Sequence, residues 1–136
     1  MTTNYARWPG DTSCRVNADG DIVIDGTAYR RHPNGGGLVA ITATVSETAF
    51  VGLFARVCDN AQVCDNARVC GNALVYGNAL VYGNAWVSGN ARVCGNALVY
   101  DDAHVYGNAW VCGEAWVSGN ALVSGNAEHI KGHISK

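Results

Sequence analysis

A six-residue period constrains this chain more than any other feature. Valine recurs at every sixth position from Val39 to Val123, fifteen times without a gap. Alanine follows each valine by four positions, from Ala43 to Ala127, again fifteen times. A period of six does not keep one side of an α-helix buried, because a helix turns once in 3.6 residues. The array therefore predicts short strands separated by bends, wound into a coil whose valines and alanines face inward.

From Val57 onward the repeat unit is V-[C/Y/S]-[G/D]-N-A-x, and it occurs twelve times. Its third position is glycine nine times and aspartate three times, and its fourth is asparagine ten times. Valine is β-branched and suits a buried strand, whereas Gly-Asn favours a turn because both residues tolerate left-handed backbone. We expect a three-residue strand centred on each valine, alanine on the inside of the bend, and asparagines stacked along the corners.

This pattern resembles the hexapeptide-repeat superfamily of parallel β-helices, which includes acyltransferases and γ-class carbonic anhydrases. Within that superfamily, the chain most resembles little-characterised bacterial and prophage proteins with runs of the form GNAxVxGNAxV. The match covers residues 39–128. The resemblance implies an all-β fold with left-handed winding, in which three hexapeptides make each triangular coil and the fifteen hexapeptides make about five coils.

The two ends of the chain depart from the repeat. We expect residues 1–38 to form a β cap and an entry loop that cover the first coil, because repeat proteins need capped ends. The entry loop contains the run Gly35-Gly36-Gly37, but no Gly-Lys-Ser/Thr follows it, so a phosphate-binding loop is disfavoured. Residues 39–128 form the predicted β-helix, and residues 129–136 form a short tail that leaves the register at the last coil.

Composition excludes several classes of partner. The net charge is −2 and the pI is about 6.0. The chain therefore lacks the excess of basic residues that is typical of a nucleic-acid-binding protein. No apolar run approaches the roughly 20 residues of a membrane span, and the first residues lack the pattern of a signal peptide. Five of the six cysteines share one repeat position, which favours reduced thiols. Cys94 and Cys112 are expected to be neighbours in one column and could meet, but reduced thiols are the expectation for this pair too. We therefore expect a cytoplasmic protein without nucleic-acid or membrane partners.

The outward positions carry the candidate binding residues, because side chains eighteen residues apart are expected to stack in columns. One face is expected to gather apolar and aromatic side chains: Leu80, Tyr82, Leu98, Tyr100 and Trp116. Further candidates lie on the other faces: Trp86, Tyr106 and Trp110. Such a patch is unusual on a monomer, and Tyr and Trp anchor interfaces. It favours a homo-oligomer, either dimer or trimer; the alternative is that aromatic columns only stabilise strand stacking.

Catalysis is the competing hypothesis. The resemblance implies that a minimal hexapeptide-family acyltransferase would place a catalytic histidine in a cleft between subunits, and the coils contain only His104. The coils lack the inserted loops typical of those enzymes, and the carbonic anhydrases need three converging histidines. The spacing of Cys58, Cys64 and Cys70 puts these thiols on three different faces, where they cannot share a metal ion. We expect no cofactor.

The sequence thus favours a non-catalytic structural or protein-binding β-helix scaffold that self-associates through its aromatic face. A phage or prophage origin, with the protein acting by binding a host protein, fits the resemblance. The acyltransferase remains the alternative, and His104 distinguishes the two. A position in a cleft between subunits, bonded to a carboxylate and beside open volume, would favour the enzyme, whereas packing between aromatic rings or exposure to solvent would argue against it.

Overall fold

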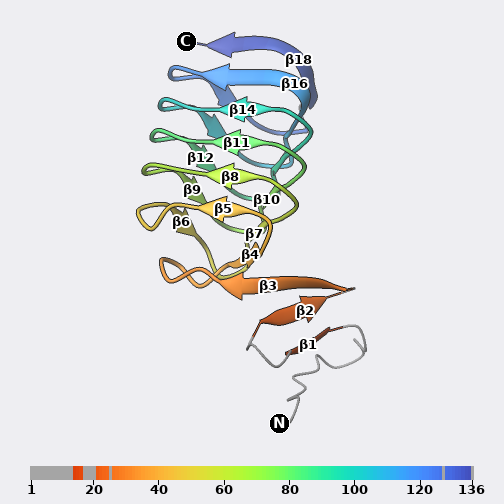
Figure 1. The fold of residues 1–136 in the computed structure, drawn as a ribbon. Helices are drawn as coiled ribbons and strands as arrows, with labels where there is room; N and C mark the ends of the chain where they lie inside the picture. Colours follow the sequence, from red (N-terminus) through yellow and green to blue (C-terminus); the bar gives the residue numbers. More distant parts are fainter. Residues whose placement is uncertain (1–13, 17–20, 25, 127, 136) are drawn as a thin grey trace.

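The computed structural model describes residues 14–16, 21–24, 26–126 and 128–135. This part of the chain winds into a parallel β-helix, and it contains no α-helix (Figure 1). Strands eighteen residues apart lie side by side, so Val75 pairs with Val57 on one side and with Val93 on the other. Three hexapeptides therefore make one coil, and the predicted parallel β-helix of about five coils is confirmed.

The strands stack on three faces. The first face holds β4 (Leu38–Ala40), β7 (Arg56–Val57), β10 (Leu74–Val75), β13 (Arg92–Val93) and the start of β16 (Trp110–Ser118). The second face holds β5 (Thr44–Val45), β8 (Gln62–Val63), β11 (Leu80–Val81), β14 (Leu98–Val99) and the end of β16. The third face holds β6 (Phe50–Val51), β9 (Arg68–Val69), β12 (Trp86–Val87), β15 (His104–Val105) and β17 (Leu122–Val123).

Most of these strands have two residues rather than the expected three. The residue after each valine still extends the ladder, because Cys58 N–H donates to the Val75 carbonyl and Tyr76 N–H donates to the Val93 carbonyl. The valines from Val51 to Val117 are fully buried, and the alanines beside them fill the inside of the bends. The interior is therefore filled by two repeat positions alone, which leaves the two outward positions of each hexapeptide free to vary.

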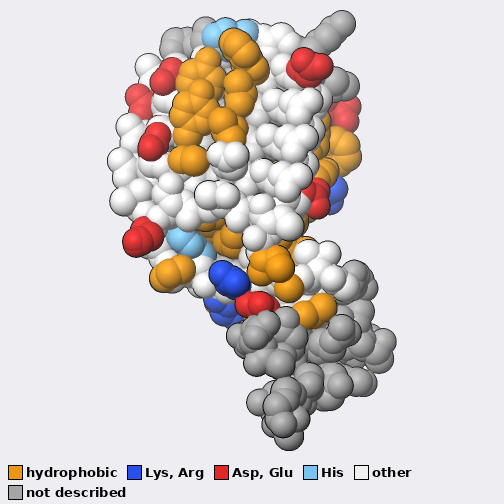
Figure 2. Space-filling view, viewed as in Figure 1, with side chains coloured by type: hydrophobic (Ala, Val, Ile, Leu, Met, Phe, Trp, Pro, Cys, Tyr) orange, Lys and Arg blue, Asp and Glu red, His pale blue; other side chains and the backbone are white. Residues whose placement is uncertain are grey.

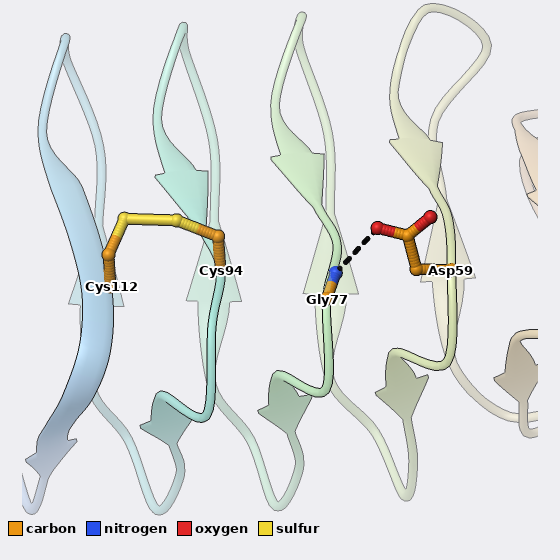
Figure 3. The surroundings of a disulfide bond; sticks show 4 residues. All are labelled: Asp59, Gly77, Cys94 and Cys112. Carbon is orange, nitrogen blue, oxygen red and sulfur yellow. Dashed lines mark hydrogen bonds between the residues drawn. A yellow bond between two sulfur atoms is a disulfide. The ribbon is translucent and has the colours of Figure 1, made fainter.

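From Asp59 onward, the corners use left-handed backbone at the glycine position and not at the asparagine, whereas the first coil, with Ile41, Glu47 and Leu53 at this position, does not. Gly89 has a φ of 64°, and the aspartates that replace glycine do the same, with 57° at Asp59 and 59° at Asp101. Each such aspartate accepts a hydrogen bond from the next corner, as Asp59 Oδ2 does from Gly77 N–H at 3.0 Å (Figure 3). The predicted asparagine columns are present at two of the corners, for example Asn72 Nδ2 to Asn90 Oδ1 at 3.3 Å.

The N-terminal strands extend the first face below the coils. β1 (Cys14–Val16), β2 (Ile22–Ile24) and β3 (Thr27–Arg31) form an antiparallel meander, and β3 pairs with β4 (Figure 1). This arrangement lengthens one face and leaves a hollow of about 220 Å³ beneath the first coil, lined in part by Arg31, Val39 and Val45. Within the described residues, the first coil is therefore covered only in part.

The entry loop closes the lower edge of the third face. His32 Nε2 and Asn34 Nδ2 both hydrogen-bond to the Ala49 carbonyl, and Gly37 N–H donates to the Val51 carbonyl. A Cβ atom on Gly35 would lie 2.2 Å from the Val51 carbonyl oxygen. The glycine run is therefore required for close approach of two backbone segments, which gives it a structural role.

The C-terminal segment forms β18 (Glu128–Ser135), which pairs in parallel with β16. Its register shifts by one residue at the corner: Glu128 lies beside Trp110, whereas His133 lies beside Trp116. Ile134 consequently stands next to Val117 and packs against the buried core. The segment expected to be a short tail thus continues the first two faces, and it omits one residue at the corner between them.

Candidate interaction surface

The second face carries an apolar strip built from two adjacent columns. In Figure 2 this strip runs along the upper part of the face that β8, β11 and β14 form. One column contains Leu80, Leu98 and Trp116 on paired strands. In the other column, the rings of Tyr82 and Tyr100 stack with centroids 5.0 Å apart and planes 5° from parallel. The structure therefore brings together the five residues that the sequence placed on one face.

The strip is only partly exposed, and its upper end projects most. Trp116 is 45% exposed, whereas Tyr82 and Tyr100 are half-buried against each other. Burial raises the pKa of the Tyr82 phenol, and the neighbouring Tyr100 and Asp101 raise it further. The phenol consequently stays neutral to higher pH than a free tyrosine, and the strip keeps its uncharged character.

The three faces differ in charge, since the first and third faces carry arginines and the second does not. The columns of β8, β11, β14 and the end of β16 contain no Lys, Arg, Asp or Glu. On the third face the Arg68 guanidinium lies 5.5 Å from the Trp86 ring centroid. On the first face the corresponding distance from Arg92 to Trp110 is 5.3 Å. The predicted candidates Trp86, Tyr106 and Trp110 therefore lie apart from the strip, on faces that also carry cations.

His104 is packed among aromatic rings. Its ring centroid lies 4.7 Å from that of Trp86 and 6.3 Å from that of Tyr106. These side chains, with Ser88 and Leu122, line an open hollow of about 380 Å³. The hydrogen bonds and ion pairs within the described residues give His104 no carboxylate partner. The aromatic packing is the arrangement expected of a structural histidine, whereas the open volume beside the ring is one of the features expected of the enzyme.

The cysteines differ from the prediction in one respect. Cys94 and Cys112 form a disulfide between adjacent coils, with their Cα atoms 4.5 Å apart (Figure 3). The expectation of reduced thiols was wrong for this pair, because the column holds the two Cα atoms 4.5 Å apart, within the range that a disulfide spans. Cys58, Cys64 and Cys70 are free. No cluster of metal-ligating side chains occurs among the described residues.

The disulfide also removes one argument for the expected location, since disulfides persist mainly in oxidising compartments. A cytoplasmic location remains a prediction. Within the residues that the structure describes, no helix has the length and apolar character needed to cross a membrane.

Sequence analysis missed two features of the surface. His133 extends the apolar strip, because its ring packs edge-on against Trp116 at 5.7 Å and its Nε2 hydrogen-bonds to the Ser118 hydroxyl. The eighteen-residue spacing does not predict this placement, because the register shift puts His133 seventeen residues after Trp116. The second feature is an exposed pair, Leu53-Phe54, at a corner of the first coil. The sequence did signal it, since Gly-Asn occupies the equivalent positions one coil later, at Gly71-Asn72.

Comparison with known proteins supports the fold and adds no activity. A family model described as the YdcK beta solenoid repeat matches residues 61–75, 67–81, 73–89 and 91–107. The chain is thus similar to that repeat over its middle coils. No curated protein and no solved structure matches the chain. The chain is a β-helix repeat protein, and its resemblance to prophage proteins in particular stays a prediction.

Proposed function

We propose that this protein is a non-catalytic β-helix scaffold that self-associates through the apolar strip of its second face. The observation that carries the proposal is an uncharged strip of stacked aromatic and leucine side chains that ends in Trp116, which is 45% exposed. Folding buries the core completely without these side chains. Their exposed area therefore remains available for a partner, and large apolar patches on soluble proteins commonly mark interfaces.

A second copy of this chain is the partner that the strip fits best. A two-fold interface places the same patch on both subunits, so the patch must tolerate its own charge. The second face meets this condition because its columns contain no charged side chain. The first and third faces do not, since Arg92 and Arg68 would each approach the same arginine or its neighbours.

The expected interface is small. The strip covers three coils, and strands stack about 4.8 Å apart, so its length along the axis is roughly 15 Å. A strip of this length is expected to bury less surface than the roughly 1,200–2,000 Å² of a standard interface. Interfaces smaller than the standard size are usually weak and transient. We therefore expect dissociation at low micromolar concentration, which corresponds to a binding free energy of about −8 kcal/mol or weaker.

Sedimentation velocity over a concentration series tests the proposal. The wild-type chain should shift from monomer to dimer or trimer between roughly 1 µM and 1 mM, and Trp116→Glu should remain monomeric because it buries a charge in the contact. Trp110→Glu is the matched control, since Trp110 occupies the same repeat position on the first face and is 40% exposed. A wild-type chain that stays monomeric throughout, or equal effects of both variants, would refute self-association through this face.

The wider form of the proposal adds a phage or prophage origin and the binding of a host protein, and it rests on the resemblance of the repeats alone. For the acyltransferase, the open hollow beside His104 is the supporting feature, but the ring packs at a tilt against Trp86 and lacks a carboxylate partner within the described residues. A His104→Gln variant that retains the wild-type self-association would agree with a structural role for this ring.

A further inference from the structure

One corner of the first coil departs from the repeat in a way that the fold does not explain. Leu53 and Phe54 occupy the two corner positions between the third and first faces. In the coils above, the same corner carries a glycine and an asparagine each time, beginning with Gly71-Asn72 and Gly89-Asn90. Leu53 is 55% exposed and Phe54 is 75% exposed. Among the described residues, the most exposed large apolar side chain thus stands where a polar one is the rule.

The other two corners of the first coil show what the fold needs there. Thr42 and Thr48 occupy the position equivalent to Phe54, and their hydroxyls donate to the backbone carbonyls of Asp59 and Asp65 in the next coil. A phenylalanine side chain cannot make this bond. Phe54 therefore contributes nothing comparable to the stacking of the first coil on the second.

The surroundings of this corner combine apolar surface with unpaired positive charge. Leu53, Phe54, Leu38 and Ala55 line a hollow of about 390 Å³ whose rim carries Arg31 and Arg56. The Arg31 guanidinium donates to the Gly36 carbonyl, and the Arg56 guanidinium lies 5.3 Å from the Tyr29 ring centroid. Neither arginine forms an ion pair within the described residues. The ion pair found there joins Arg30 to Asp21.

We propose that the Leu53-Phe54 corner is a docking site for an acidic, apolar segment of another protein. An apolar side chain of the partner would fill the hollow against Leu53 and Phe54, and carboxylates on either side would pair with Arg31 and Arg56. Charge complementarity selects this partner, since the two guanidinium groups that flank the apolar surface have no carboxylate partner in the described part of the chain. A basic or purely apolar segment would leave both arginines unpaired.

This site is separate from the apolar strip of the second face. The strip lies on β11, β14 and β16 of the upper coils, whereas the corner belongs to the first coil between β6 and β7. The two proposals can therefore fail independently. Trp116→Glu should change the oligomeric state and leave binding at the corner intact.

Fluorescence anisotropy with defined peptides tests the docking site. The probes are labelled synthetic peptides with a central Leu-Phe pair flanked by glutamates, and matched peptides with lysines in place of the glutamates. The acidic peptides should bind the full-length chain, and the affinity should fall as salt rises, because the flanking charges are exposed and screened. The lysine peptides should not bind. Arg31→Gln should weaken binding of the acidic peptides and reduce the salt dependence.

The decisive variant is Leu53→Gly combined with Phe54→Asn, which gives this corner the pair found at Gly71-Asn72 directly above it. The variant should fold, because the new asparagine extends an existing corner column. Its affinity for the acidic peptides should fall at least roughly tenfold, as expected for loss of a central apolar contact. Three outcomes would overturn the proposal: no binding to the wild-type chain, equal binding to the double variant, or a change in oligomeric state in the double variant. The last outcome would assign the corner to a second copy.

Discussion

Substitution of Gly89 tests the account of the corners most directly. Gly89 has a φ of 64°, and a Cβ atom placed on it would lie 3.0 Å from the nitrogen and 3.1 Å from the oxygen of Gly107 in the next coil. Left-handed backbone costs a residue with a Cβ about 1–2 kcal/mol, and forcing extra atoms into a packed site costs about 1–3 kcal/mol. Gly89→Val should therefore lower the free energy of unfolding by about 2–5 kcal/mol.

Gly89→Asp should behave differently, although it also adds a Cβ atom. Asp59, Asp65 and Asp101 already occupy the equivalent position, and each accepts a hydrogen bond from the amide of the next corner at 3.0–3.2 Å. Aspartate adopts left-handed backbone more readily than most residues with a Cβ, and a hydrogen bond to a charged group contributes about 1.5–3 kcal/mol. These terms offset the crowding, so Gly89→Asp should remain within about 1 kcal/mol of the wild-type chain.

Urea denaturation followed by far-ultraviolet circular dichroism measures both variants. Gly125→Val provides a matched control, because Gly125 also has left-handed backbone, at 69°, but a Cβ atom placed on it would meet no other atom within 4 Å. It should show only the backbone cost of about 1–2 kcal/mol. The reasoning would be refuted if Gly89→Val were no worse than Gly125→Val, or if Gly89→Asp were as damaging as Gly89→Val.

Two further predictions concern side chains on the outer faces. In the absence of reductant, alkylation followed by peptide mass spectrometry should leave Cys94 and Cys112 unlabelled while Cys64 is labelled, and prior reduction should make all three reactive; labelling of Cys94 without reductant would show that the disulfide does not form. Because the pKa of Tyr82 is raised, the folded chain holds the phenol proton more tightly than the unfolded chain. The contribution of this proton to the free energy of unfolding is therefore complete below pH 10 and is lost as the pH rises through the folded pKa. Burial raises the pKa of Tyr29 as well, so ultraviolet titration should show late-ionising phenols, and Tyr82→Phe should remove one of them while that of Tyr29 remains.

The repeat made the interior predictable, because every coil imposes the same limits on the same positions. Val57 and Val75 pair as the eighteen-residue spacing requires, and alanine occupies each bend where little volume remains. The columns of the second face follow from the same arithmetic, so the sequence was sufficient to gather Leu98 and Trp116 on one strip. What a position faces is thus set by its place in the repeat.

Features that depend on a local break in the repeat were not predictable in this way. The one-residue register shift in β18 places His133 beside Trp116. A periodic pattern cannot predict the position at which the chain omits a residue. The disulfide between Cys94 and Cys112 depends on how closely two residues of one column approach, and the eighteen-residue spacing permits this bond but does not require it. From Asp59 onward, the left-handed residue at each corner is glycine or aspartate, because close approach to the next coil excludes most side chains there.

Departures from a strict repeat differ in what they say about function. Asp101 replaces a corner glycine, and its carboxylate accepts a hydrogen bond from Gly119 N–H at 3.2 Å, so the fold itself accounts for this change. Thr48 replaces a corner asparagine, and its hydroxyl bonds to the next coil. Phe54 replaces the asparagine of the neighbouring corner, makes no such bond and is 75% exposed. Because exposed apolar surface without a structural role serves contact with a partner better than it serves the fold, the Leu53-Phe54 corner and the Trp116 strip are the two places where variants should separate binding from stability.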